Sequence, residues 1–145
     1  MKRAFLLYDA AMYDLRGKQI FDHERKFYIA DHVFRKALFS GYDHGNGKIL
    51  ENLIFMEAIS HGYTVFVGRI GDLEVDFVLE KYGKKMYIQV AYILIDNDVI
   101  EREFRSLRQI SDNWPKYVIS LDPFSIGTID GIGHISAWEM EKIFE

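Results

Sequence analysis

The sequence feature that most constrains the fold is one helical segment followed directly by three β-type runs. Residues 48–61 carry apolar side chains at helical spacing, and Gly62 follows at the position where many helices end. The next three runs, rich in apolar and β-branched residues, cover 63–70, 73–82 and 84–94. This half of the chain therefore predicts one helix followed by three strands of a sheet.

Further elements toward the C-terminus complete the order αβββαβ. Polar residues at 96–98 predict the start of a helix whose apolar positions continue to Ile110. Residues 116–121 have the apolar density of a buried parallel strand. A last short strand is expected at 132–135 and a closing helix at 137–144. We therefore expect an α/β fold with a mixed central sheet and helices on both faces.

The first 46 residues predict an extension packed on this core. Three short strands are expected in it, over 5–15, 19–21 and 26–30. Asp31 has the character of an N-cap, which predicts a short helix after it. Residues 1–46 would thus form a β/α extension and residues 47–145 the main domain, in a single folding unit.

Composition indicates a soluble, intracellular protein. Of the 145 residues 49% are hydrophobic, which argues against disorder, and no cysteine is present for disulfides or thiolate metal sites. No apolar run reaches membrane-spanning length or forms a signal peptide, so we expect a cytoplasmic location and no membrane partner. The net charge of -4 argues against a dedicated nucleic-acid binder.

Two carboxylates stand in apolar surroundings that give them no obvious reason to be there. Glu51 lies in a helical segment that is apolar nearly all round, where a carboxylate is costly unless it is paired or binds a cation. Asp76 interrupts a strand whose odd positions are all apolar. If Tyr82–Gly83 is a two-residue hairpin turn, Asp76 lies opposite Gln89 and on the same face. The structural alternative is a buried Glu and a sheet-edge Asp, each satisfied by its neighbours.

Acidic groups that converge with a carbonyl oxygen are hard ligands suited to Mg²⁺ or Mn²⁺. Such an ion activates water and neutralises developing charge during phosphodiester cleavage, and a nearby lysine helps to orient the water. Glu51 and Asp76 are therefore candidate metal ligands, and Gln89 joins them as a candidate catalytic residue.

These residues resemble the motifs of the PD-(D/E)XK nucleases, which have an acid on the first helix, an acid on the second strand and a three-residue motif on the third. Residues 47–122 further resemble a conserved C-terminal domain of unknown function in bacterial and archaeal P-loop ATPases of the AAA superfamily. That resemblance implies a P-loop ATPase domain as partner, either upstream in the same chain or in a separate protein. The phrases that carry it are GKILEN (47–52), EVDFV (74–78), YIQVAY (87–92), EREF (101–104) and PKYVISLD (115–122), and KFYIAD (26–31) resembles the entry to that domain.

One position departs from the nuclease pattern. The third motif should end in lysine, but Ala91 stands there, so cleavage would need a lysine from elsewhere, such as Lys48, Lys85 or Lys116. The leading hypothesis is an accessory module of a P-loop ATPase, nuclease-like but inactive, that acts in interaction or regulation. The alternatives are a Mg²⁺-dependent DNA or RNA nuclease with a displaced lysine, and a nucleic-acid-binding module.

Other motifs carry less weight. Arg102 and Arg105 lie one helical turn apart and are candidate phosphate or nucleic-acid contacts, although Glu101 favours intrahelical ion pairs on a solvated face. The five histidines have no metal-ligand spacing and are expected at the surface or in loops. No Gly-x-Ser-x-Gly motif supports a hydrolase triad, and the glycines of 41–48 lack phosphate-loop spacing.

Overall fold

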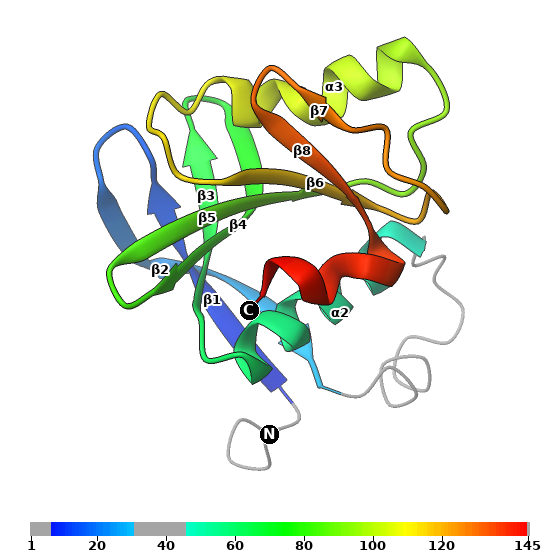
Figure 1. Ribbon diagram of the computed structural model, residues 1–145. Coiled ribbons are helices and arrows are strands. Elements are labelled where there is room, and N and C mark those ends of the chain that lie inside the picture. The colour runs from blue at the N-terminus through cyan, green and yellow to red at the C-terminus, as the bar shows by residue number, and fades with distance from the viewer. Residues whose placement is uncertain (1–6, 31–45, 145) are drawn as a thin grey trace.

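The computed structural model describes residues 7–30 and 46–144 (Figure 1). The strands in these ranges are β1 (Leu7–Asp14), β2 (Gln19–Ile29), β3 (Thr64–Ile70), β4 (Leu73–Lys81), β5 (Lys84–Val90), β6 (Lys116–Ser120), β7 (Thr128–Ile129) and β8 (Ile132–Ser136). The helices are α2 (Asn46–Ser60), α3 (Asn97–Arg108) and the 3₁₀ helix η2 (Ala137–Ile143). None of the three has the length and apolar character needed to cross a membrane.

All the described strands belong to one mixed sheet, in the order β2-β1-β3-β4-β5-β6-β8-β7. The pairs β1–β3, β5–β6 and β6–β8 are parallel, and the other neighbouring pairs are antiparallel. Because β1 and β2 lie in this sheet, the strands before residue 46 share one hydrogen-bonded layer with those after it.

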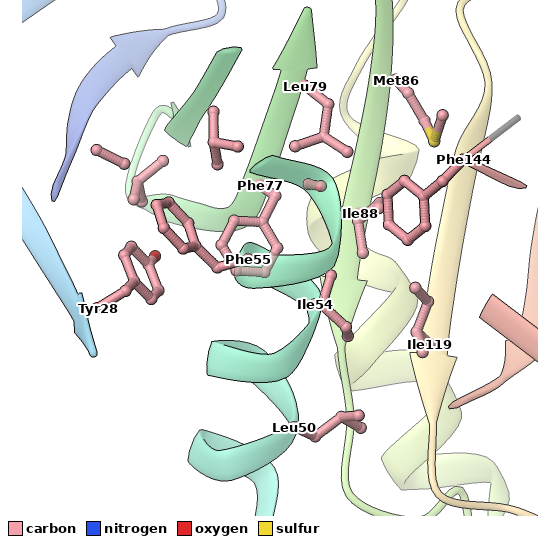
Figure 2. Packing of buried hydrophobic residues seen from close by; sticks show 14 residues of the cluster. Tyr28, Leu50, Ile54, Phe55, Phe77, Leu79, Met86, Ile88, Ile119 and Phe144 are labelled. Atoms are coloured by element: carbon pink, nitrogen blue, oxygen red, sulfur yellow. The ribbon is translucent and has the colours of Figure 1, made fainter. Parts of the chain in front are cut away.

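The sheet separates two apolar layers. Helices α2 and η2 cover one face of the sheet and α3 covers the other (Figure 1). Figure 2 shows the first layer, in which Ile54 and Phe55 of α2 lie near Phe77 and Ile88 of the sheet, with Phe144 beside them. The predicted mixed α/β sheet with helices on both faces is therefore confirmed.

Two predicted local signals are also confirmed. Asp96 is the N-cap of α3, and its carboxylate accepts a hydrogen bond from the N–H of Val99 at 2.9 Å. Tyr82 and Gly83 form the turn between β4 and β5 with φ values of 53° and 74°. Positive φ at both positions is what a two-residue type I′ turn requires. The hairpin register predicted from this turn therefore holds.

Some elements differ from those expected. β2 is one strand of 11 residues rather than two short ones, because its charged middle section lies at the edge of the sheet, where polar side chains reach solvent. β5 ends at Val90 instead of residue 94, the closing helix is a 3₁₀ helix, and β7 was not expected. The helix expected after Asp31 lies outside the described residues.

Candidate functional site

A β-bulge in β4 directs the Asp76 side chain toward helix α2. The register of β3 and β4 shifts by one residue, so that Val67 alone lies opposite both Asp76 and Phe77. Val75 before the bulge and Val78 after it pack on the α3 side, whereas Phe77 packs on the α2 side. Because bulges change the direction of a side chain, Asp76 shares the α2 side with Phe77 instead of alternating with it.

Asp76 also replaces backbone pairing between β4 and β5. The regular ladder between these strands ends at Phe77 and Ile88. Beyond that pair, the Val90 N–H donates to Asp76 Oδ2 at 2.8 Å, and the Asp76 N–H donates to Gln89 Oε1 at 3.2 Å. The predicted opposition of Asp76 and Gln89 is therefore realised through side-chain hydrogen bonds rather than a backbone ladder.

Gln89 does not share a face with Asp76, so that expectation is wrong. Its Oε1 also accepts a hydrogen bond from Ser106 Oγ of α3 at 3.4 Å. The side chain thus lies on the α3 side of the sheet, where strand alternation places it. The bulge at Asp76, which the sequence does not reveal, separates the two residues.

Lys26 of β2 supplies the positive charge of the site. Its Nζ lies 2.6 Å from Glu51 Oε1 on α2 and 3.0 Å from Glu74 Oε1 on β4. Burial alone would lower the pKa of Lys26, but the charges of Glu51 and Glu74 outweigh it and raise the pKa above its ordinary value. Lys26 therefore stays protonated and holds the two carboxylates together.

Sequence reasoning did not find Lys26 and named other lysines instead. Lys85 Nζ donates to the Tyr13 hydroxyl at 3.1 Å, and Lys116 Nζ donates to the Asp112 carbonyl at 2.6 Å. Lys48 is exposed near the start of α2. None of the three contacts the carboxylates of the site. The signal that could have found Lys26 is its alternation with Tyr28, which places both on one face of β2.

Asn52 fixes the position of α2 against β2, and with it the position of Glu51. Its side chain is 5% exposed. Oδ1 accepts from the Ile29 N–H at 2.9 Å, and Nδ2 donates to the Ile29 carbonyl at 2.5 Å. The amide thus pairs with both backbone groups of Ile29, as a neighbouring strand would at the edge of the sheet. This contact places the preceding residue, Glu51, beside Lys26.

Negative charge in the site is only partly balanced. Burial, and then the charge of Glu51, raise the pKa of Asp76 to about 7, against the opposing effects of Val90 and Lys26. Tyr28 is 3% exposed and its hydroxyl makes no hydrogen bond of good geometry within the described residues. Burial and the charges of Glu51 and Asp76 raise the pKa of that hydroxyl, so it stays protonated.

As arranged, these residues do not fit a divalent metal ion. In the part of the chain that the structure describes, no group of three or more His, Cys, Asp or Glu residues is placed to hold one. Glu51 Oε1 binds Lys26, Asp76 Oδ2 binds a backbone N–H, and Gln89 faces α3. Mg²⁺ needs several oxygen ligands in near-octahedral geometry, and these oxygens do not converge in that way.

The arginines of α3 lie on the other side of the sheet from this site. Arg102 binds Glu103 at 2.9 Å, and Glu101 pairs with Arg108 at 2.6 Å rather than with Arg105. Arg105 is exposed. The helix therefore presents a solvated face with ion pairs, and Arg102 and Arg105 do not extend the carboxylate site.

A second polar cluster lies among the loops at the carboxyl ends of the parallel strands. His134 is 1% exposed, so the expectation of a surface or loop histidine is wrong for it. Its Nδ1 accepts from the Ile126 N–H at 2.9 Å, which leaves Nε2 to donate to Ser120 Oγ at 2.7 Å. Ser120 Oγ in turn donates to Asp122 Oδ2 at 2.5 Å.

This cluster is structural rather than hydrolytic. The serine lies between the histidine and the aspartate, so His134 donates a proton toward Ser120 and cannot act as its base. Burial lowers the pKa of His134, while the charge of Asp122 acts in the opposite direction. The net lowering of the pKa keeps the ring neutral. Asp122 Oδ2 also accepts from the Leu94 N–H, and the Asp122 backbone carbonyl accepts from Ser136 Oγ, so the cluster joins the loops after β5 and β6 to the end of β8.

Fold and site thus define a mixed α/β protein with a partly buried lysine–carboxylate cluster between its edge strand, α2 and β4. The chain is 33% identical over 132 residues to an uncharacterized protein of Haemophilus influenzae. The match covers 91% of this chain but 32% of that relative, so the chain spans about a third of the curated protein that it matches. No family model matches the chain, and no solved structure matches it.

Proposed function

We propose that this chain is a non-catalytic module with a nuclease-like fold of the PD-(D/E)XK type, which acts in interaction or regulation on a P-loop ATPase domain. The observation that carries the proposal is the internal cation. Lys26 binds Glu51 and Glu74, while Ala91, 4% exposed, fills the place of the motif lysine. A lysine held between two carboxylates offsets part of their negative charge without any bound ion.

The order of the elements supports the nuclease-like type. α2 is followed by β3, β4 and β5, then by α3 and β6, which reproduces the αβββαβ order. Glu51 and Asp76 lie on the same side of the sheet, as the resemblance to the nucleases implies. The fold therefore suits a nuclease ancestor whose carboxylates remain while its lysine has been lost.

Exposed apolar side chains support a role in interaction. Ile95, Phe124 and Trp138 are 74%, 81% and 72% exposed. They follow the carboxyl ends of β5, β6 and β8, which are parallel neighbours, so all three belong to the same edge of the sheet. Large apolar residues gathered at one edge suit contact with another domain. The greater length of the Haemophilus influenzae relative agrees with a module of a larger protein.

A second candidate function is Mg²⁺-dependent cleavage of nucleic acid, and one observation favours it. A lysine does reach the carboxylates, from β2 rather than from the third motif. In this reading Lys26 would replace the motif lysine, and Glu51 would have to leave its ion pair for a metal to bind. In the non-catalytic module Lys26 prevents metal binding, whereas in the nuclease Lys26 is needed for cleavage. Substitution of Lys26 therefore distinguishes the two functions.

The test is calorimetric titration with Mn²⁺ of the wild type, Lys26→Met, Asp76→Ala and the exposed-lysine control Lys48→Met, followed by cleavage assays on plasmid and single-stranded DNA. If Lys26 is an internal counter-ion, the wild type and the control neither bind Mn²⁺ nor cleave, and Lys26→Met gains Mn²⁺ binding because Glu51 and Glu74 are released. Cleavage by the wild type that is lost in Lys26→Met and kept in Lys48→Met would establish the nuclease instead.

A further inference from the structure

A hollow of about 440 Å³ lies beside the β4–β5 hairpin, away from the carboxylate site. Its size falls in the range of small-molecule sites, about 300–1,000 Å³. Tyr63, Trp114 and Tyr117 supply aromatic walls, and Met86 and Ile143 add aliphatic surface. The walls are thus suited to a flat apolar body rather than to a hydrated ion alone.

Three lysines line this hollow, and two of them stand directly opposite each other while Lys85 Nζ donates to the Tyr13 hydroxyl. Lys81 and Lys84 are directly opposite each other in the β4–β5 ladder, and both line the hollow. They share the α2 side of the sheet with Met86, because positions two apart in a strand face the same way. Like charges placed directly opposite destabilise a strand pair, so this arrangement costs the hairpin stability.

Among the described residues, no carboxylate forms an ion pair that would relieve this repulsion. Neither lysine forms an ion pair with any acidic residue in the described ranges 7–30 and 46–144. Lys81 Nζ donates to the His61 carbonyl at 2.7 Å and lies over the rings of Tyr63 and Tyr82, at 5.1 and 5.5 Å. Lys84 is exposed. In a chain with a net charge of -4, the two lysines thus form a local concentration of positive charge that no described acidic residue pairs with.

We infer that the hollow binds a phosphate group carried on an aromatic heterocycle, which is the chemistry of a nucleotide. Ammonium groups form strong, charge-assisted hydrogen bonds with phosphate oxygens, and two of them flank the opening. Trp114, 38% exposed, and Tyr82, 91% exposed, offer ring faces on which a base can stack. A free nucleotide and the terminal nucleotide of a nucleic-acid strand present the same groups.

This site is independent of the proposed function. Lys81 lies five residues beyond Asp76 on β4, which is about 17 Å along an extended strand. Binding at the hollow requires neither a metal ion nor Lys26. A bound phosphate also offsets the repulsion between Lys81 and Lys84, so ligand binding stabilises the folded protein as well as occupying the hollow.

The test is to titrate the protein with adenosine 5′-monophosphate. Binding is measured by calorimetry and, separately, by the shift in melting temperature. Adenosine and inorganic phosphate, tested separately, each supply half of the recognised chemistry and should bind at least about tenfold more weakly. Lys84→Glu should weaken binding of the nucleotide by about tenfold or more, because it removes a charged donor. Lys48→Glu is the matched control, since it makes the same charge change at an exposed position elsewhere, and it should leave binding unchanged.

Lys84→Glu carries its own check on folding. Without ligand it should melt at a higher temperature than the wild type at low salt, because an opposite charge then faces Lys81. A 5′-phosphorylated oligonucleotide that binds as well as the mononucleotide assigns the site to strand ends, and one that does not assigns it to free nucleotides. Failure of the wild type to bind at millimolar nucleotide, or equal weakening by Lys84→Glu and Lys48→Glu, would overturn the inference.

Discussion

Two polar clusters lie on this sheet, one around the buried Ser120 and His134 and one, partly exposed, around Lys26, and they differ in how completely their groups are paired. In the cluster of Ser120, Asp122 and His134, both ring nitrogens and the serine hydroxyl have hydrogen-bond partners. In the cluster around Lys26, the Tyr28 hydroxyl makes no hydrogen bond of good geometry within the described residues, and the pKa of Asp76 is raised to about 7. The polar groups of the first cluster are therefore paired, whereas the second cluster contains a hydroxyl that makes no such hydrogen bond and a carboxyl whose pKa is raised.

The difference decides what each cluster contributes to the stability of the fold. A fully paired network joins loops and contributes specificity to the fold, and each of its members is costly to remove. A cluster with an unpaired hydroxyl and a carboxyl of raised pKa costs the fold stability, which is the usual mark of a site kept for another purpose. The comparison therefore predicts that substitutions in the two clusters change the free energy of unfolding in opposite directions.

The largest effect is expected at His134. His134→Ala should lower the free energy of unfolding by roughly 3–5 kcal/mol, because it leaves a cavity, leaves the Ile126 N–H without its acceptor and removes the donor to Ser120 Oγ. Urea denaturation measures the change. His23→Ala is the control, since that side chain is 78% exposed, and it should change stability by less than about 0.5 kcal/mol. A loss below about 1 kcal/mol at His134 would contradict the structural role assigned to the network.

The next effect should have the opposite sign. The pKa of Asp76 is about 7 in the folded protein and about 3.9 in an unfolded chain, so the folded state binds more protons between these values. The contribution of Asp76 to the free energy of unfolding is therefore fully present below about pH 4. It decreases as the pH rises from about 4 to about 7 and does not change further above about pH 7. Asp76→Asn removes the titration and keeps an acceptor for the Val90 N–H.

We expect Asp76→Asn to stabilise the protein at pH 8 by on the order of 2–4 kcal/mol, at about 1.4 kcal/mol for each unit by which the pKa is raised. The gain should shrink toward zero near pH 4. Urea denaturation of both proteins at several pH values measures it, and the difference between them cancels the titration of groups that do not interact with Asp76. A gain that does not depend on pH, or a loss at pH 8, would show that Asp76 is not buried with uncompensated charge.

The contrast also explains what the sequence could and could not predict. Glu51 and Asp76 were found because an acid in an apolar helical or strand pattern is visible within one short segment. The Tyr82–Gly83 turn set the strand register for the same local reason. Lys26 was missed because its role depends on β2, β4 and α2 meeting in space, and its alternation with Tyr28 gives only the face of β2 on which it lies.

Two further errors have a physical cause of the same kind. The bulge at Asp76 depends on the pairing of β4 with β3, which lies outside the hairpin that fixed the register. His134 was assigned to the surface because its burial depends on a partner, Ser120, that lies on another strand. Local patterns thus predict elements and single unusual residues, whereas tertiary pairing decides which polar groups are satisfied.

The smallest effect is expected at Tyr28, and it tests the incomplete cluster directly. The ring stacks on Phe55 with centroids 4.0 Å apart, but the buried hydroxyl makes no hydrogen bond of good geometry within the described residues. Tyr28→Phe keeps the ring and should change the free energy of unfolding by less than about 0.5 kcal/mol, whereas Tyr28→Ala should cost about 3–5 kcal/mol in lost packing. If Tyr28→Phe instead costs more than about 1 kcal/mol in urea denaturation, the hydroxyl donates to Glu51 in solution. The carboxylate cluster would then be as fully paired as the histidine network, and the distinction between the two would rest on Asp76 alone.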